Sequence, residues 1–160
     1  MNFASVIWIF RQKIVTLHAN CILGNMTNKE LYHEFCLKNS ELPLFMTDWW
    51  LDAVCAGKHW DVLLSHDEQG TIQAALPYLL RKRVWVRYIV MPQQTQIGGI
   101  WLREDIANDT DKTATVCQQF AQQLSELGLH YYYQHYAINS VAVEQMQHLG
   151  FKIKERVTYR

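Results

Sequence analysis

The sequence predicts an α+β domain in which helices cover a mixed, mainly antiparallel sheet. Its 160 residues suit one domain with a real core, and its hydrophobic content of 49% is that of an ordinary globular protein. Apolar residues recur at strand periodicity in some segments and at helix periodicity in others. Capping residues and glycines delimit these segments in the order helix, helix, three antiparallel strands, helix, strand, helix, strand.

The first helix is predicted over residues 28–38. Thr27 can act as its N-cap, and Glu30 follows at the spacing of a capping box. Met26 can pack against Leu31 as a hydrophobic staple across the helix start. The start signals of a folded unit are therefore complete from Met26 onward.

Residues 1–25 precede these signals and are expected to be an N-terminal extension, either an accessory segment or part of an upstream start. Residues 3–10 are apolar, but Arg11 and Lys13 follow at once, so no uninterrupted run reaches membrane length. A signal peptide carries its positive charge before the apolar run, whereas here the charge comes after it. We expect neither a signal peptide nor a membrane anchor, and we expect residues 26–160 to form a single lobe.

A second helix is predicted to begin at Thr47 or Asp48 and to end at Gly57. Trp49 and Trp50 lie in its first turn. Adjacent residues on a helix point about 100° apart, so the two rings cannot share one contact. One ring is expected to pack on the sheet, and the other to cover a loop or line a groove. Packing of both rings is the alternative.

The sheet is predicted to begin with a hairpin of residues 61–65 and 71–80. Gly70 closes the intervening loop, where a positive φ is needed. Pro77 has no N–H for a ladder, which implies a bulge or a solvent-facing edge at that position. The other elements follow in order: a turn at Arg81-Lys82-Arg83, a central strand over residues 84–91, a helix opened by residues 108–111 and ended by Gly128, a strand over residues 131–136, a short helix capped by Asn139 or Ser140 and ended by Gly150, and a last strand over residues 151–159.

Charge and cysteine content limit the classes of partner and site. The net charge of zero gives no global attraction to nucleic acid or anionic membranes, so we expect neither DNA nor a membrane as partner without a local patch. The basic groups in residues 81–87 and 152–156 are expected to be solvated, with contact to RNA phosphates as the alternative. The four cysteines form no C-x-x-C pair, which predicts reduced thiols in a cytoplasmic protein. His130 and His135 face opposite sides of a strand, so no metal site is expected.

Two resemblances carry a functional hypothesis. Asn139-x-x-Ala142 followed by Gly150-Phe151 resembles the last helix of the GNAT acyltransferase fold, N-x-x-A-x(7)-G-F, and the element order is similar to that fold. A more specific resemblance covers most of residues 26–160. It rests on Pro43-Leu44-Phe45, Trp49-Trp50-Leu51-Asp52-Ala53-Val54, Trp60-Asp61-Val62, Ala75-Leu76-Pro77-Tyr78 and Met91-Pro92-x-x-Thr95-Gln96-x-Gly98-Gly99-x-Trp101. Together these segments look like the N-terminal lobe of the double-GNAT, Fem-like acyltransferases.

The resemblance implies half of a two-lobe enzyme that transfers an acyl or aminoacyl group to an amine. Arg160 falls about where the first lobe of that pattern ends. The implied partners are a second GNAT-like lobe, or self-association through the exposed lobe face, and a small-molecule or peptide amine as acceptor. Acetyl-CoA or another acyl donor is implied for the full-length family.

This lobe departs from the family pattern for coenzyme A binding, Q/R-x-x-G-x-G/A before a helix. Its Gly98 and Gly99 have a different spacing, and Asp109 and Asp111 at the following helix start would repel a pyrophosphate. We therefore expect no cofactor on this lobe and assign no catalytic residue. The residues predicted to line an acceptor groove are Trp49, Trp50, Gln94, Thr95, Gln96 and Trp101.

Two alternatives remain open at the level of the sequence. The chain could be a complete single-lobe, acetyl-CoA-dependent N-acetyltransferase. It could also be a non-enzymatic interaction module, which predicts an exposed apolar patch.

Overall fold

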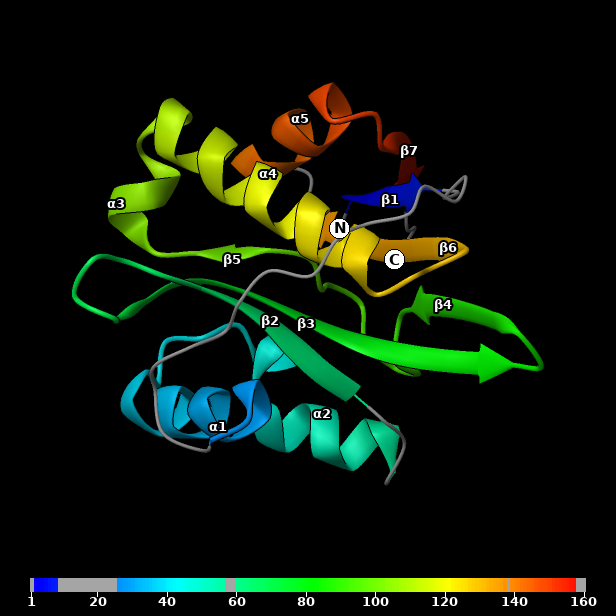
Figure 1. Ribbon diagram of the computed structural model, residues 1–160, viewed down its shortest axis with the longest axis horizontal. Coiled ribbons are helices and arrows are strands. Elements are labelled where there is room, and N and C mark those ends of the chain that lie inside the picture. The colour runs from blue at the N-terminus through cyan, green and yellow to red at the C-terminus, as the bar shows by residue number, and fades with distance from the viewer. Residues whose placement is uncertain (1, 9–25, 57–59, 138, 158–160) are drawn as a thin grey trace.

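Helices cover both faces of a seven-stranded sheet (Figure 1). The computed structural model describes residues 2–8, 26–56, 60–137 and 139–157. The strands are β1 (Asn2–Trp8), β2 (Trp60–His66), β3 (Ile72–Arg83), β4 (Val86–Val90), β5 (Trp101–Leu102), β6 (Tyr131–Ala137) and β7 (Lys152–Val157). The helices are α1 (Asn28–Lys38), the short 3-10 helix η1 (Leu44–Met46), α2 (Asp48–Cys55), α3 (Glu104–Ala107), α4 (Thr110–Glu126) and α5 (Val141–His148).

The strand order is β2-β3-β4-β6-β1-β7, and β5 pairs with β3. Among the described strands, β4 and β6 run parallel, and every other pair is antiparallel. Helices α1 and α2 lie on one face of the sheet, and α4 and α5 lie on the other (Figure 1). The predicted α+β class with a mixed, mainly antiparallel sheet is confirmed.

The side chains on the two faces of β3 belong to two separate cores, because successive side chains of a strand point to opposite faces of the sheet. Leu76 and Tyr78 belong to the core under α4 and α5, together with Phe120. Ala75 and Leu79 belong to the core under α1 and α2. The central strands are therefore apolar on both sides because a helical layer covers each side.

Local signals set the bounds of α1 and α2. The capping box at α1 is confirmed: the Thr27 hydroxyl accepts from the Glu30 N–H at 3.2 Å, and the Glu30 carboxylate accepts from the Thr27 N–H at 2.6 Å. Helix α2 has Thr47 at its N-cap position and ends at Cys55, where Ala56 adopts a left-handed φ of +46°. The predicted end at Gly57 lies outside the described residues.

The predicted turn at Arg81-Lys82-Arg83 is wrong. Strand β3 continues through these residues, and Arg83 pairs with Val86. The turn consists of Val84 and Trp85, with Val84 at a φ of +56°. Charged side chains are accommodated in an exposed strand end as well as in a turn. The run of cations therefore did not indicate where the turn lies.

The predicted bulge or solvent-facing edge at Pro77 is also wrong. Pro77 is buried and pairs with Val62 of β2. On its other side, β5 pairs with β3 at Ala74 and Ala75, and β4 pairs from Leu79 onward. Pro77 falls between these two partners, so no neighbouring strand needs its missing N–H. The irregularity of this ladder lies instead between Ser65 and His66.

Strand β1 comes from the N-terminal segment whose role the sequence left open. It lies between β6 and β7 and is antiparallel to both, with Asn2 opposite Val157. Within the described part of the chain, no helix is long and apolar enough to cross a bilayer.

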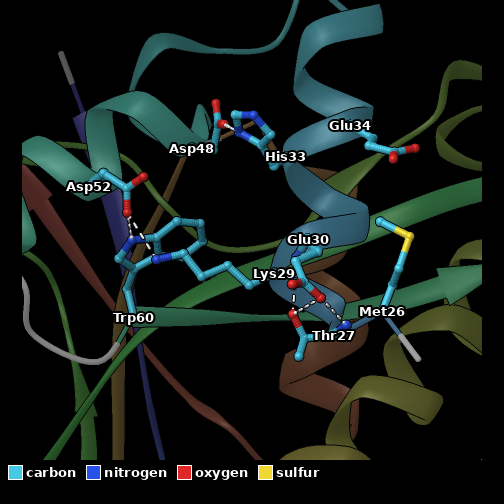
Figure 2. A pocket seen from close by; sticks show the side chains of 9 residues that line it. All are labelled: Met26, Thr27, Lys29, Glu30, His33, Glu34, Asp48, Asp52 and Trp60. Carbon is cyan, nitrogen blue, oxygen red and sulfur yellow. Dashed lines mark hydrogen bonds and ion pairs between the residues drawn. The ribbon is translucent and has the colours of Figure 1, made fainter.

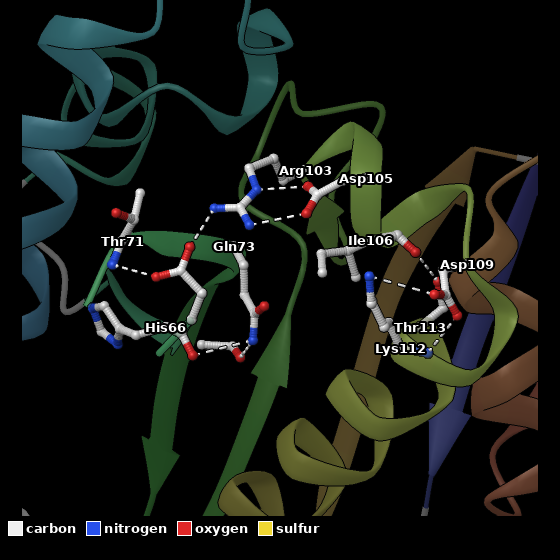
Figure 3. A network of polar contacts seen from close by, with 11 residues as sticks. His66, Thr71, Gln73, Arg103, Asp105, Ile106, Asp109, Lys112 and Thr113 are labelled. Atoms are coloured by element: carbon white, nitrogen blue, oxygen red, sulfur yellow. Dashed lines mark hydrogen bonds and ion pairs between the residues drawn. The ribbon is translucent and has the colours of Figure 1, made fainter. Parts of the chain in front are cut away.

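A polar network ties the β2–β3 loop to the start of α3, which the sequence did not predict (Figure 3). Arg103 donates to Asp67 at 2.8 Å and to both carboxylate oxygens of Asp105, at 2.6 and 3.0 Å. The Arg103 N–H donates to the Gln73 carbonyl at 2.9 Å. The hydrogen bonds from Arg103, with one from the Thr71 N–H, hold the pKa of Asp67 below its usual value.

We expect this network to weaken in acid. A carboxyl whose pKa is lowered by folding stabilises the protein fully above its unfolded pKa of about 3.9, and that stabilisation is lost as the pH falls through the folded pKa. Arg103→Gln should raise the pKa values of Asp67 and Asp105 toward the unfolded value, as followed by NMR titration of the carboxyl groups. Lys152→Gln, at an exposed position of β7, should leave both pKa values unchanged. Equal titration curves in wild type and Arg103→Gln would contradict the assignment.

Candidate functional site

A cavity of about 650 Å³ lies between α1, α2 and the start of β2 (Figure 2). Its lining is rich in ionisable groups. The lining residues are Met26, Thr27, Lys29, Glu30, His33, Glu34, Asp48, Asp52 and Trp60. Four carboxylates, the Lys29 ammonium and the His33 imidazole therefore line a single cavity, and this excess of carboxylates favours a cation.

His33 and Asp48 form a hydrogen-bonded pair at this cavity. His33 projects from the middle of α1, and Asp48 is the first residue of α2, where it is buried. Tyr32, beside His33 in sequence, donates its buried hydroxyl to the Met46 carbonyl at 2.6 Å and so fixes α1 against the start of α2. Because the Asp48 carboxylate can only accept, Nδ1 of His33 carries the proton of this hydrogen bond, and Nε2 is the ring nitrogen that this contact leaves available.

A second polar group holds the other end of the cavity. The Asp52 carboxylate accepts from the Lys29 ammonium at 2.9 Å and from the Trp60 indole N–H at 2.7 Å. Partial burial opposes ionisation of Asp52, but these two hydrogen bonds prevail and lower its pKa. The Lys29 ammonium also lies 4.1 Å from the centre of the Trp60 ring, a cation–π contact. Trp60 thus contacts both Lys29, through its ring, and Asp52, through its indole N–H, and fixes their positions at the cavity.

Cys36 lies one turn along α1 from Tyr32 and is half-buried. Burial and the charge of Asp48 raise the pKa of Cys36 to about 11. A thiol with such a pKa stays protonated at neutral pH, so Cys36 is a poor nucleophile. The chemistry available at the cavity is that of His33 and the carboxylates.

Sequence reasoning missed this cavity, although a signal for it exists. Lys29 and His33, and likewise Asp48 and Asp52, are four residues apart, a spacing that places both members of a pair on one face of a helix. Two neighbouring helices with such pairs can bring them together. What the spacing cannot give is the relative rotation of α1 and α2.

The structure brings three of the six predicted groove residues together, namely Trp49, Trp50 and Thr95. The rings of Trp49 and Trp50 meet edge-on, with centres 6.1 Å apart. Trp50 and Thr95 are brought together, with the indole N–H donating to the Thr95 hydroxyl at 3.1 Å. Trp101 packs edge-on against Phe35, with ring centres 5.1 Å apart. Trp49, Gln94 and Gln96 are exposed to solvent.

The segment after β4 fills a gap in the sheet. Strands β4 and β6 pair only through Tyr88–Tyr131 and Ile89–Tyr132. Beyond this point Gly98 takes the place beside β6, and its N–H donates to the His135 carbonyl at 2.7 Å. The space that remains between Pro77, Gly98 and Gln134 is about 10 Å³, which is about the volume that one water molecule needs.

Gln134 holds this segment from the buried face of β6. Its side-chain oxygen accepts from the Gly99 N–H at 3.0 Å and from the Tyr132 hydroxyl at 3.2 Å. Its amide group donates to the Pro77 carbonyl at 2.7 Å. One amide side chain thus joins β3, β6 and the Gly98–Gly99 segment, and the gap between β4 and β6 is closed by the chain itself.

The start of α4 also offers little to an anion. The Asp109 carboxylate accepts from the N–H groups of Asp111 and Lys112, both at 3.1 Å. Two of the free N–H groups of the helix start are therefore already satisfied by a negative charge. Within the described ranges, no group of three or more His, Cys, Asp or Glu residues is arranged to hold a metal ion.

Comparison with known proteins gives no relative from which a role could be transferred. The chain matches no family model, no curated protein and no solved structure.

Proposed function

We propose that this chain is the acceptor-side lobe of a Fem-like acyltransferase, which binds an amine and leaves the acyl donor to a second lobe. The observation that carries the proposal is the cavity between α1 and α2, where four carboxylates, one ammonium and the His33 imidazole line about 650 Å³. An amine acceptor is a cation at neutral pH, so this charge distribution favours its binding. The element order and the segments that resemble the Fem-like N-terminal lobe supply the reaction class.

The filled gap between β4 and β6 supports the assignment of the donor to another lobe. An extended acyl donor could pair with free backbone groups where two strands separate. Here the Gly98 N–H and the Gln134 side chain use those groups. The N–H groups at the α4 start, the other natural place for a phosphate, are engaged by Asp109.

The chemistry proposed for the complete enzyme is attack of the amine nitrogen on a thioester or ester carbonyl. A base first takes one proton from the bound ammonium and frees the lone pair of its nitrogen. The nitrogen then forms the new N–C bond, the C–S or C–O bond breaks, and the second amine proton goes to the leaving thiolate or alkoxide. His33, with Nδ1 held by Asp48, presents Nε2 as that proton acceptor. The chain alone is expected to transfer no acyl group. Cys36 and Cys117 form no disulfide within the described part of the chain, which suits the proposed cytoplasmic location.

Calorimetry on the purified chain tests the proposal. Spermidine, as a probe amine, should give saturable heat, and acetyl-CoA should give none. Glu34→Gln removes one exposed carboxylate of the cavity and should weaken spermidine binding about threefold, the size of one partly screened charge interaction. Glu104→Gln, on α3, is the matched control and should change nothing.

Each alternative has its own outcome in this experiment. Saturable heat with acetyl-CoA would show a complete single-lobe N-acetyltransferase. Absence of heat with spermidine, or equal weakening of spermidine binding by both Glu→Gln variants, would rule out the acceptor site. Either result would favour an interaction module.

A further inference from the structure

The hairpin of β3 and β4 ends in three exposed apolar side chains. Val84 is 66% exposed, Trp85 is 83% exposed and Val86 is 40% exposed. In Figure 1 this hairpin projects at the right edge, beyond the helices that cover the sheet. Single exposed apolar residues are normal on a protein surface, but three in succession at a projecting tip indicate an interaction site.

Four cations stand directly behind this apolar tip. In the ladder Arg83 pairs with Val86, and Lys82 pairs with Arg87, while Arg81 lies one position further back. Because neighbouring strand residues point to opposite faces, the hairpin is cationic on both sides. No ion pair joins any of the four to another residue in the described part of the chain.

The tip is unfavourable for stability in three ways. Val84 is β-branched and has a φ of +56°, a conformation that favours glycine. Lys82 and Arg87 are like charges directly opposite each other on neighbouring strands. Trp85 leaves nearly its whole ring in water. Folding gains nothing from these features, so they point to a role outside the fold.

We infer that the β3–β4 hairpin docks on the surface of an anionic lipid bilayer. Trp85 would sit at the level of the headgroups, where tryptophan is enriched in membrane proteins, with Val84 and Val86 beside it. Arg81, Lys82, Arg83 and Arg87 would face the anionic headgroups. Each such cation near the surface strengthens binding about fivefold, and the effect falls off with salt.

An RNA strand fits the same surface less well. Basic residues serve phosphates and headgroups alike, and Trp85 could stack on a base. Val84 and Val86, however, have no ring on which a base could stack. They enlarge the apolar surface of the tip, which favours contact with the hydrocarbon of a bilayer over contact with nucleobases. The zero net charge of the chain also means that the attraction must come from this local patch. The hairpin shares no residue with the α1–α2 cavity, so the inference does not depend on the proposed function.

Co-sedimentation with vesicles tests the inference. The chain should bind phosphatidylcholine vesicles that contain about 30% phosphatidylglycerol, and it should bind pure phosphatidylcholine vesicles at least tenfold more weakly. Trp85→Ala should weaken binding to the anionic vesicles about tenfold. Trp49→Ala is the matched control, since Trp49 is another exposed indole, 58% accessible, on α2, and it should leave binding unchanged.

A second pair of variants tests the charges. Lys82→Gln with Arg83→Gln should weaken vesicle binding about 25-fold, at about fivefold per cation. Lys152→Gln with Lys154→Gln removes the same charge from exposed positions on β7 and should stay within about twofold, since those cations lie away from the apolar tip. All four altered side chains are exposed, so neither double variant should lower the melting temperature.

Three results would overturn the inference. Trp85→Ala and Trp49→Ala could weaken vesicle binding equally. Labelled poly(U) could bind more tightly than vesicles and lose that binding in Lys82→Gln with Arg83→Gln, which would identify RNA as the partner. Light scattering could show a dimer that dissociates in the Trp85→Ala variant, which would identify the tip as a contact between two copies of the chain.

Discussion

Gly99→Ala is expected to lower the free energy of unfolding by about 3 kcal/mol. A Cβ at this position would lie 2.7 Å from two ring carbons of Tyr136, which is closer than real Cβ atoms approach, and Gly99 has a φ of +85°. Tyr136 is buried in the core under α4 and α5, so its ring cannot move aside. Urea unfolding, followed by fluorescence, measures the loss.

Gly128→Ala separates the two causes of this loss. Gly128 also has a positive φ, +61°, but no atom lies within 4 Å of its added Cβ. The variant should therefore lose only the backbone contribution, about 1 kcal/mol. If both variants lost the same stability, the segment that fills the gap between β4 and β6 would not be packed against Tyr136.

Gln134→Met is expected to destabilise the protein by about 3 kcal/mol. Methionine fills a similar volume but leaves the Gly99 N–H and the Pro77 carbonyl without their hydrogen-bond partner in the interior. Each buried polar group left in this way costs about 1–3 kcal/mol. The Tyr132 hydroxyl keeps a partner, since it also lies 2.9 Å from the Tyr136 hydroxyl.

Gln118→Met, at an exposed position of α4, is the control and should stay within about 0.5 kcal/mol of wild type. Hydrogen exchange adds a local test. In Gln134→Met the Gly99 amide should exchange far faster than amides in the core of α4. A protected Gly99 amide in that variant would mean that the segment is held by other contacts.

Features that depend on short stretches of sequence were predictable. The Thr27–Glu30 capping box gave α1 its bounds, because both partners lie within one turn. Gly70 marked the β2–β3 loop and has a φ of +78°, as the turn requires. The strand predicted over residues 131–136 corresponds to β6, since its residues alternate between a buried face, with Tyr132, Gln134 and Tyr136, and a less buried one.

Features decided by distant partners were not predictable. Pro77 is tolerated because β4 and β5 leave a space beside it, and no local signal shows where those strands end. Val84 in a turn contradicts the preference of β-branched residues for extended backbone. The same holds for the candidate site: residues such as His33 and Asp48 come together only through the packing of α1 on α2.

The position of β1 has a consequence for the order of folding. Among the described strands β1 comes first in the sequence, whereas its partners on either side, β6 and β7, come last. Its pairing therefore closes a loop nearly as long as the chain, and contacts of such sequence separation form slowly. We expect β2, β3 and β4, which are joined by short hairpins, to assemble early, and the half of the sheet that contains β1 to close last.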